Sequence, residues 1–220
     1  GYYDGWAAAL EPEGGAKYSI STLAEIQAVK GGGYTPDGFG DITLNNSFIA
    51  VLDISKALYL KQFGAVGDGV ADDTDELDAY FLFAESLQPS TRITLEIGDG
   101  IYRTTRKLTA NNLKRQGING NFIIQSDHTD DWVLKLYECT ALTQTGLMQI
   151  NCKGGTTYSI RGNQVGLILE NCAAMTGEAV HVFFAQSDGI RMVGTSTRMT
   201  YDFVRTQYCG SGGAGATSAP

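Results

Sequence analysis

The sequence has few charged residues and no long apolar run. Charged residues make up only 18 % of the 220 residues, which excludes a coiled coil, because such chains are rich in charge and in Ala, Glu, Lys and Leu. No apolar stretch reaches the roughly 18 residues that a membrane-spanning helix needs, so we expect no membrane insertion. An apolar fraction of 43 % excludes a disordered chain.

Cysteine and histidine are scarce and scattered. The chain has two histidines and four cysteines, Cys139, Cys152, Cys172 and Cys209. No CxxC pair and no Cys/His cluster occurs, so the sequence predicts no zinc site, and we expect neither a metal nor a cofactor. The cysteines are too few for a disulfide framework and are expected to be reduced, buried apolar groups.

The composition favours a turn-rich, acidic, all-β protein. Glycine accounts for 28 residues, and there are 11 tyrosines and 9 phenylalanines. The formal net charge is −8, and an acidic surface repels phosphate backbones, so nucleic acid is not expected as a partner. The same excess of acid also fits simple solubility.

The glycine distribution divides the chain into three parts. Residues 1–56 are expected to form a small, Gly-rich β domain, residues 57–209 a larger unit, and residues 210–220 (GSGGAGATSAP) a flexible linker. With no initiator Met and no signal peptide, Gly1 is expected to be a processed or cut start, and the linker predicts a longer parent chain.

Two short elements are predicted within the first part. Residues 20–30 have a helical pattern with Ser21 or Thr22 as N-cap. Residues 41–44 and 48–54 are expected to be strands of a hairpin, since the connecting Asn-Asn-Ser tolerates a tight turn.

A longer amphipathic helix is predicted over residues 73–88. Asp73 and Glu76 have the spacing of a capping box, and Pro89 ends the pattern. The apolar positions recur at helical spacing on one face; they are Leu77, Tyr80, Phe81, Ala84 and Leu87.

Beyond residue 92 the sequence contains an internal repeat. GLMQINC at residues 146–152 recurs as GLILENC at residues 166–172, and more loosely at residues 189–194. Short strands at a period of about 20 residues with no intervening helix predict a solenoid of stacked parallel coils. Leu147 would then lie on Leu167 and Ile190.

The same register makes two further predictions. Asn151 would lie beside Asn171, where stacked amides satisfy each other. Cys152 would lie near Cys172 as a pair of thiols.

Residues 61–74 (KQFGAVGDGVADDT) closely resemble the opening motif of the pectate-lyase-like superfamily, in the form found in bacteriophage tailspikes and capsule depolymerases. Residues 1–56 more loosely resemble a short domain found upstream in phage proteins. In such proteins the motif leads into a helix that caps a right-handed parallel β-helix. The residues that carry the match are Phe63, Gly64, Gly67, Asp68, Gly69, Asp72, Asp73 and Thr74.

The resemblance implies a homotrimeric tailspike or tail-fibre component of the virion. Its expected partners are other phage tail or baseplate proteins and a bacterial surface glycan, either capsule or lipopolysaccharide, which it would bind and could also depolymerise. Two alternatives stay open: a secreted polysaccharide lyase or glycoside hydrolase, and a purely structural virion adaptor.

No catalytic constellation can be named from the sequence. Capping and turn formation account for the acidic cluster at residues 68–78 without a metal. Hydrolysis would need two carboxylates roughly 5–9.5 Å apart, and Glu170 with Asp188 is a poorly registered pair. The coil carboxylates considered are Asp127, Asp130, Asp131, Glu138, Glu170, Glu178, Asp188 and Asp202.

Four residues are candidates for glycan binding. Trp132, Tyr137 and Tyr158 could stack on sugar rings, although packing in the core or in a trimer interface is the alternative. His181 lies beside Phe183 and Phe184 in the sequence and could join a stacking site, the alternative being a histidine at the edge of the core.

Overall fold

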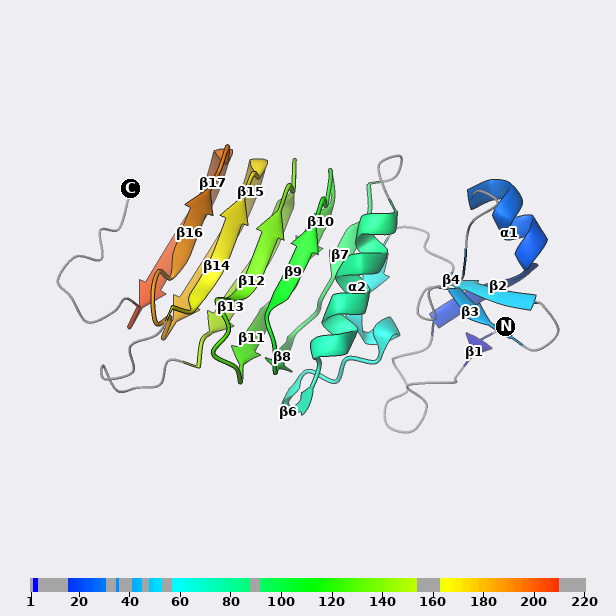
Figure 1. Ribbon diagram of the computed structural model, residues 1–220, viewed down its shortest axis with the longest axis horizontal. Coiled ribbons are helices and arrows are strands. Elements are labelled where there is room, and N and C mark those ends of the chain that lie inside the picture. Colours follow the sequence, from blue (N-terminus) through cyan, green and yellow to red (C-terminus); the bar gives the residue numbers. More distant parts are fainter. Residues whose placement is uncertain are drawn as a thin grey trace.

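Most of the chain that the computed structural model describes is β-strand, in parallel sheets that curl around a common core (Figure 1). The structure describes residues 2–3, 16–30, 35, 41–44, 48–52, 57–87, 92–153 and 163–209. Within these ranges, no helix is long and apolar enough to cross a membrane.

The first strands form a small antiparallel sheet in the order β1-β2-β4-β3. They are β1 (Tyr2–Tyr3), β2 (Ala16–Thr22), β3 (Asp41–Thr43) and β4 (Phe48–Leu52). The predicted hairpin is confirmed, because β3 pairs with β4 in antiparallel register. Its turn, residues 45–47, lies outside the described residues.

Helix α1 (Leu23–Lys30) begins later than predicted. Residues 20–22 continue the pairing of β2 with β4 instead. Thr22 is the cap: its backbone N–H donates to Glu25 Oε2 (2.8 Å), and the Glu25 N–H donates to Thr22 Oγ1 (3.3 Å), which is a capping box.

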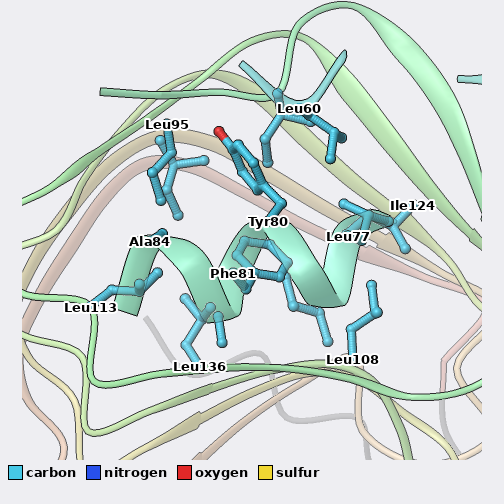
Figure 2. Packing of buried hydrophobic residues seen from close by; sticks show 14 of the residues in the cluster. Leu60, Leu77, Tyr80, Phe81, Ala84, Leu95, Leu108, Leu113, Ile124 and Leu136 are labelled. Carbon is cyan, nitrogen blue, oxygen red and sulfur yellow. The ribbon is translucent and has the colours of Figure 1, made fainter. Parts of the chain in front are cut away.

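Helix α2 (Thr74–Ser86) covers one end of the stacked sheets and confirms the predicted amphipathic stripe. The stripe residues of the helix are buried against β8 and β9, and the Tyr80 hydroxyl donates to the Leu58 carbonyl at 2.9 Å. Figure 2 shows the helix packed among buried residues of several coils; the labelled ones include Leu60, Leu95, Leu108, Leu113, Ile124 and Leu136.

Asp73, the N-cap residue of α2, does not form the predicted capping box with Glu76. Its buried carboxylate instead accepts hydrogen bonds from the backbone N–H groups of Val66 (2.7 Å) and Gly67 (3.2 Å). Asp72 bonds the first helical residue, accepting from its backbone N–H at 3.1 Å and from its hydroxyl. Asp73 therefore holds the glycine loop against the helix, a tertiary role that local spacing does not indicate.

The remaining strands form parallel ladders. The larger sheet contains β5 (Ala57–Tyr59), β6 (Asp68–Asp72), β7 (Thr94–Glu96), β8 (Gly100–Thr104), β10 (Gly117–Asn119), β11 (Phe122–Ser126), β13 (Thr143–Asn151), β15 (Ala173–Phe183) and β17 (Thr197–Gln207). The second sheet contains β9 (Leu108–Asn111), β12 (Trp132–Tyr137), β14 (Val165–Glu170) and β16 (Ile190–Val193). The short 3-10 helix η2 (Leu60–Phe63) follows β5.

Each coil stacks on the one before it, but the coils differ in length: Phe122 lies 22 residues after its partner Gly100, whereas Leu167 lies 33 residues after its partner Leu134. Residues 108, 134, 167 and 190 form one inward column of the second sheet, so the predicted pairing of Leu167 with Ile190 is confirmed. The predicted pairing of Leu147 with Leu167 is wrong. Leu147 is only half-buried and lies on the larger sheet, where β13 pairs with β15.

The register predicted from the sequence repeat is wrong because both copies of the repeat belong to the same coil. Residues 146–151 lie in β13 of one sheet and residues 166–170 in β14 of the other. Each segment enters a corner at its end, so the two share a local pattern without stacking. Asn151 accordingly pairs with Gln125 and Phe183, not with Asn171.

The corners are marked by columns of left-handed residues. One column consists of Asn112, Glu138, Asn171 and Gly194, with φ between 53° and 70°. In each coil a second left-handed residue follows three or four positions after the first. These residues form a second column, which consists of Arg115, Ala141, Ala174 and Arg198. Because L-residues rarely adopt this conformation, its recurrence once per coil shows that successive coils bend at the same positions.

The cysteines are free and at least half-buried, as predicted, but the predicted partner of Cys172 is wrong. Cys139 and Cys172 occupy equivalent positions of neighbouring coils, and their thiols donate to the carbonyls of Ala110 (3.6 Å) and Leu136 (3.2 Å), respectively. The nearby Cys172 thiol, and then burial, raise the pKa of the Cys139 thiol. Cys152 lies on a different corner of the coil.

Candidate functional site

The residues of the predicted opening motif lie at the end of the stack that α2 covers. Phe63 is buried, and Gly64, Gly67 and Gly69 have positive φ. Asp68 Oδ1 accepts from the backbone N–H groups of Val70 and Ala71, both at 2.8 Å, as expected for a turn residue. Among the described residues, no group of three or more His, Cys, Asp or Glu side chains is placed to hold a metal ion.

Several candidate carboxylates are engaged in ion pairs. Glu170 pairs with Lys135 (3.2 Å), and Asp188 pairs with Arg191 (2.6 Å). The strand neighbours of Glu170 are Tyr137 and Val193, so the structure does not bring Glu170 and Asp188 together.

Asp127 joins three coils at one corner. Its carboxylate pairs with Lys153 Nζ at 2.8 Å and with the guanidinium of Arg103. Hydrogen bonds from these two cations lower the pKa of Asp127 from 3.8 to about 2. Because the folded pKa lies below the unfolded one, this contribution to stability is complete above about pH 4 and is lost as the pH falls toward 2.

We therefore expect Asp127→Asn to flatten the acid dependence of stability. The wild type should lose more free energy of unfolding between pH 4 and pH 2 than the variant does, as measured by urea unfolding at both pH values. Asp202→Asn is the control, because Asp202 is exposed and forms no ion pair with a described residue. Equal losses in the wild type and Asp127→Asn would contradict the ion-pair assignment.

A continuous chain of aromatic rings runs along the outer surface of β15 and β17 and onto the corners that follow them. We call it the aromatic ridge and define it as Phe203, His181, Phe183, Phe184 and Tyr208. The ring centroids of Phe203 and His181 are 5.3 Å apart, and those of His181 and Phe183 are 6.0 Å apart. Phe183 and Phe184 are 6.2 Å apart. The rings of Phe184 and Tyr208 are 5.3 Å apart and parallel within 4°.

The ridge faces solvent because the strands alternate. Val180 and Val182 of β15 point into the core and are buried, so His181 and Phe183 point outward. Phe203 and Tyr208 are each 53 % exposed. Contiguous exposed apolar patches are where interaction surfaces are found, which makes the ridge a candidate binding site.

Polar groups surround the ridge. Along the strands, Gln149, His181 and Arg205 form one outward column, and Asn151 and Gln207 flank Phe183 in the next. Partial burial, and secondarily the Arg205 guanidinium, lowers the pKa of His181. The imidazole is therefore neutral at pH 7, so the surface combines ring faces, amide groups and one cation.

Two carboxylates lie next to the ridge. Gly177 pairs with Tyr201 and Ala179 with Phe203, so Glu178 and Asp202 are opposite each other on neighbouring strands, whose backbones lie roughly 4.8 Å apart. Both are exposed, and Glu178 Oε2 accepts from the Gly146 N–H at 2.7 Å.

Trp132 and Tyr137 lie together on the second sheet, away from His181. Lys135 Nζ is 4.4 Å from the Trp132 ring and 5.6 Å from the Tyr137 ring, and Lys107 Nζ is 4.2 Å from the Trp132 ring. The indole N–H donates to the Leu108 carbonyl at 2.9 Å. A sugar would have to displace a lysine to stack on Trp132. Tyr158 lies outside the described residues.

Phe183 and Phe184 are recognisable beside His181 in the sequence, whereas Phe203 and Tyr208 were not predicted to belong to the site. These two residues belong to the coil that follows the one containing His181. Phe203 pairs with Ala179 of that preceding coil, and the Tyr208 ring stacks on Phe184. With the correct coil length, Phe203 and Tyr208 align with the residues around His181. With the shorter period of the sequence repeat, they do not.

Comparison with known proteins shows the fold only. The sequence matches no family model and no curated relative. Among solved structures, ORF18 of Geobacillus virus E2 is similar at a TM-score of 0.54 and 15 % identity, over 82 % of this chain and 47 % of the viral chain. A candidate glycosyl hydrolase from Parabacteroides merdae is similar at a TM-score of 0.54 and 14 % identity, over 71 % and 76 %. This chain thus spans about half the length of the viral protein.

Proposed function

We propose that this chain is a component of a bacteriophage tail that attaches the virion to a bacterial surface polysaccharide through the aromatic ridge. The observation that carries the proposal is the solvent-facing chain of five rings flanked by amide side chains. Aromatic faces pack against the apolar faces of sugar rings, and amides bond their hydroxyls. The opening motif at residues 61–74 and the fold shared with a viral protein support the phage assignment.

The proposal extends to the architecture. The described coils would be part of a right-handed parallel β-helix over residues 57–209, since crossovers between parallel strands are right-handed in ~98 % of cases. Residues 1–56 would face the virion and other tail proteins, and residues 210–220 would be a linker. The protein would act as a homotrimer, which a mass measurement of the native protein in solution tests.

We expect Phe203→Ala to weaken binding to the host polysaccharide about tenfold, because a central aromatic contact is lost. Binding is measured by titrating purified capsule or lipopolysaccharide. Met192→Ala is the matched control, since Met192 is 58 % exposed on β16 and lies outside the ridge. Its affinity should equal that of the wild type.

The second sheet supplies the competing surface. Trp132→Ala, with Tyr137→Ala, tests whether the cluster around Lys135 binds the glycan instead. Loss of binding in Trp132→Ala together with full binding in Phe203→Ala would overturn the assignment to the ridge. Absence of any glycan binding by the native trimer would favour a structural adaptor.

A second candidate function is polysaccharide hydrolysis, which the placement of Glu178 opposite Asp202 favours. Retaining glycosidases use two carboxyl groups about 5–5.5 Å apart, a separation that opposite positions on neighbouring strands allow. The assay follows release of reducing ends from the bound polysaccharide, with Glu178→Gln and Asp202→Asn as variants. Release that both substitutions abolish would establish the enzyme, either on the virion or as a secreted protein, and unchanged release would remove this pair from consideration.

A further inference from the structure

Arg205 gives the aromatic ridge one accessible positive charge. Arg205 is exposed on the outer face of β17, between the columns of Phe203 and Gln207. Its guanidinium lies 5.6 Å from the Phe183 ring and donates to Gln207 Oε1 at 2.6 Å. No ion pair links it to any carboxylate of the described residues.

Half of the lysines and arginines that the structure describes in residues 57–209 are neutralised by an ion pair. Arg103, Lys107, Lys135, Lys153 and Arg191 each pair with a carboxylate within 3.4 Å. In an acidic chain, a guanidinium left without a carboxylate beside exposed rings is a suitable site for an anionic ligand, because a planar fork of donors matches a carboxylate.

The remaining charges near the ridge restrict the charge pattern of a ligand that would fit it. His181, which follows Gln149 in the same column as Arg205, is neutral at pH 7 and adds no charge. Glu178 and Asp202 lie beyond Phe203, toward the register shift in the larger sheet. One end of the surface is therefore negative and the other positive, so a ligand with isolated carboxylates fits better than a densely charged polyanion.

From this arrangement we propose that the ridge selects an acidic glycan, in which a sugar carboxylate binds Arg205 while a neighbouring ring stacks on Phe203 and Phe183. This inference rests on the proposed function and adds the chemical class of the ligand. Neutral sugars of the same chain would occupy the end near Glu178 and Asp202, where carboxylates accept hydroxyl hydrogen bonds.

The test compares native acidic capsular polysaccharides with the same polymers after their carboxyl groups have been reduced to alcohols. The native full-length protein and four variants are titrated against each pair: Arg205→Gln, Arg205→Lys, Phe203→Ala and Arg198→Gln. Arg198 is the matched control, because it is also an exposed arginine of β17 without an ion pair to a described residue, and it lies outside the ridge.

We expect the wild type and Arg198→Gln to bind a native acidic polymer at least about tenfold more tightly than its reduced form, since a hydrogen bond between charged groups is worth that much. Arg205→Gln should bind both forms alike, at the affinity that the wild type has for the reduced form. Arg205→Lys should keep part of the preference. Phe203→Ala should lose affinity for both forms.

The outcomes separate the two proposals. Binding that responds to Phe203→Ala but not to carboxyl reduction or Arg205→Gln would overturn the acidic ligand and leave the ridge as a site for neutral glycans. An equal loss in Arg198→Gln and Arg205→Gln would also overturn it, since general charge would then explain the effect. Failure of every polymer to bind the wild type would overturn both proposals.

Discussion

Replacing Phe81 by alanine is expected to lower the free energy of unfolding by about 3–5 kcal/mol, the usual cost of removing a buried phenylalanine. Phe81 is 2 % exposed at the centre of α2, and its ring packs against Tyr80 at 5.7 Å. The helix closes the apolar end of the stacked coils, so a cavity there loosens the contact between the cap and the first coil (Figure 2). Urea unfolding of the purified protein measures the effect.

Leu82 supplies the control from the same helix. It follows Phe81 directly but is 65 % exposed, so Leu82→Ala should change stability by no more than about 0.5 kcal/mol. Equal costs for the two substitutions would show that α2 does not cover the end of the stack.

Gly146→Ala is expected to cost about 2–3 kcal/mol of stability, the upper part of the usual range for a single substitution. Gly146 has φ +83°, and an added Cβ would lie 2.5 Å from the backbone oxygen of Gly120 on the coil below. Backbone cannot yield as a flexible side chain does, so the two coils must separate locally. Thermal or urea unfolding gives the value.

The contrasting substitution is Ala141→Gly at another corner. Ala141 has φ 54°, a conformation that glycine adopts without strain, and this gain offsets the greater freedom of glycine in the unfolded chain. Its stability should stay within about 1 kcal/mol of the wild type, since the two effects are of similar size. A larger loss for Ala141→Gly than for Gly146→Ala would contradict the corner geometry.

Local chemistry in the sequence predicted the single elements well. The apolar spacing of Leu77, Tyr80, Phe81 and Ala84 identified α2, and Thr22 capped α1, because both depend on residues three or four positions apart. Stacking depends instead on the length of each coil. The sequence between β13, which ends at Asn151, and β14, which begins at Val165, is longer than that between β15, which ends at Phe183, and β16, which begins at Ile190, so a fixed period could not give the register.

The aromatic ridge could not be predicted for the same reason, because its prediction requires the length of each coil. Phe184 and Tyr208 stack because they occupy equivalent corners of successive coils, which neither residue reveals alone. Asp73 was assigned to a local cap because its partners, the N–H groups of Val66 and Gly67, lie across a loop whose path is set by positive-φ glycines. The ridge thus depends on contacts between coils, and the role of the Asp73 carboxylate depends on contacts across this loop.

A crystal structure of the native protein soaked with an oligosaccharide of an acidic bacterial surface polysaccharide tests the proposed binding surface most directly. A sugar ring is expected over Phe203 and Phe183, with a sugar carboxylate at Arg205. Sugar bound over Trp132 on the second sheet, with the ring surface of β15 and β17 empty or covered by a neighbouring subunit, would contradict it.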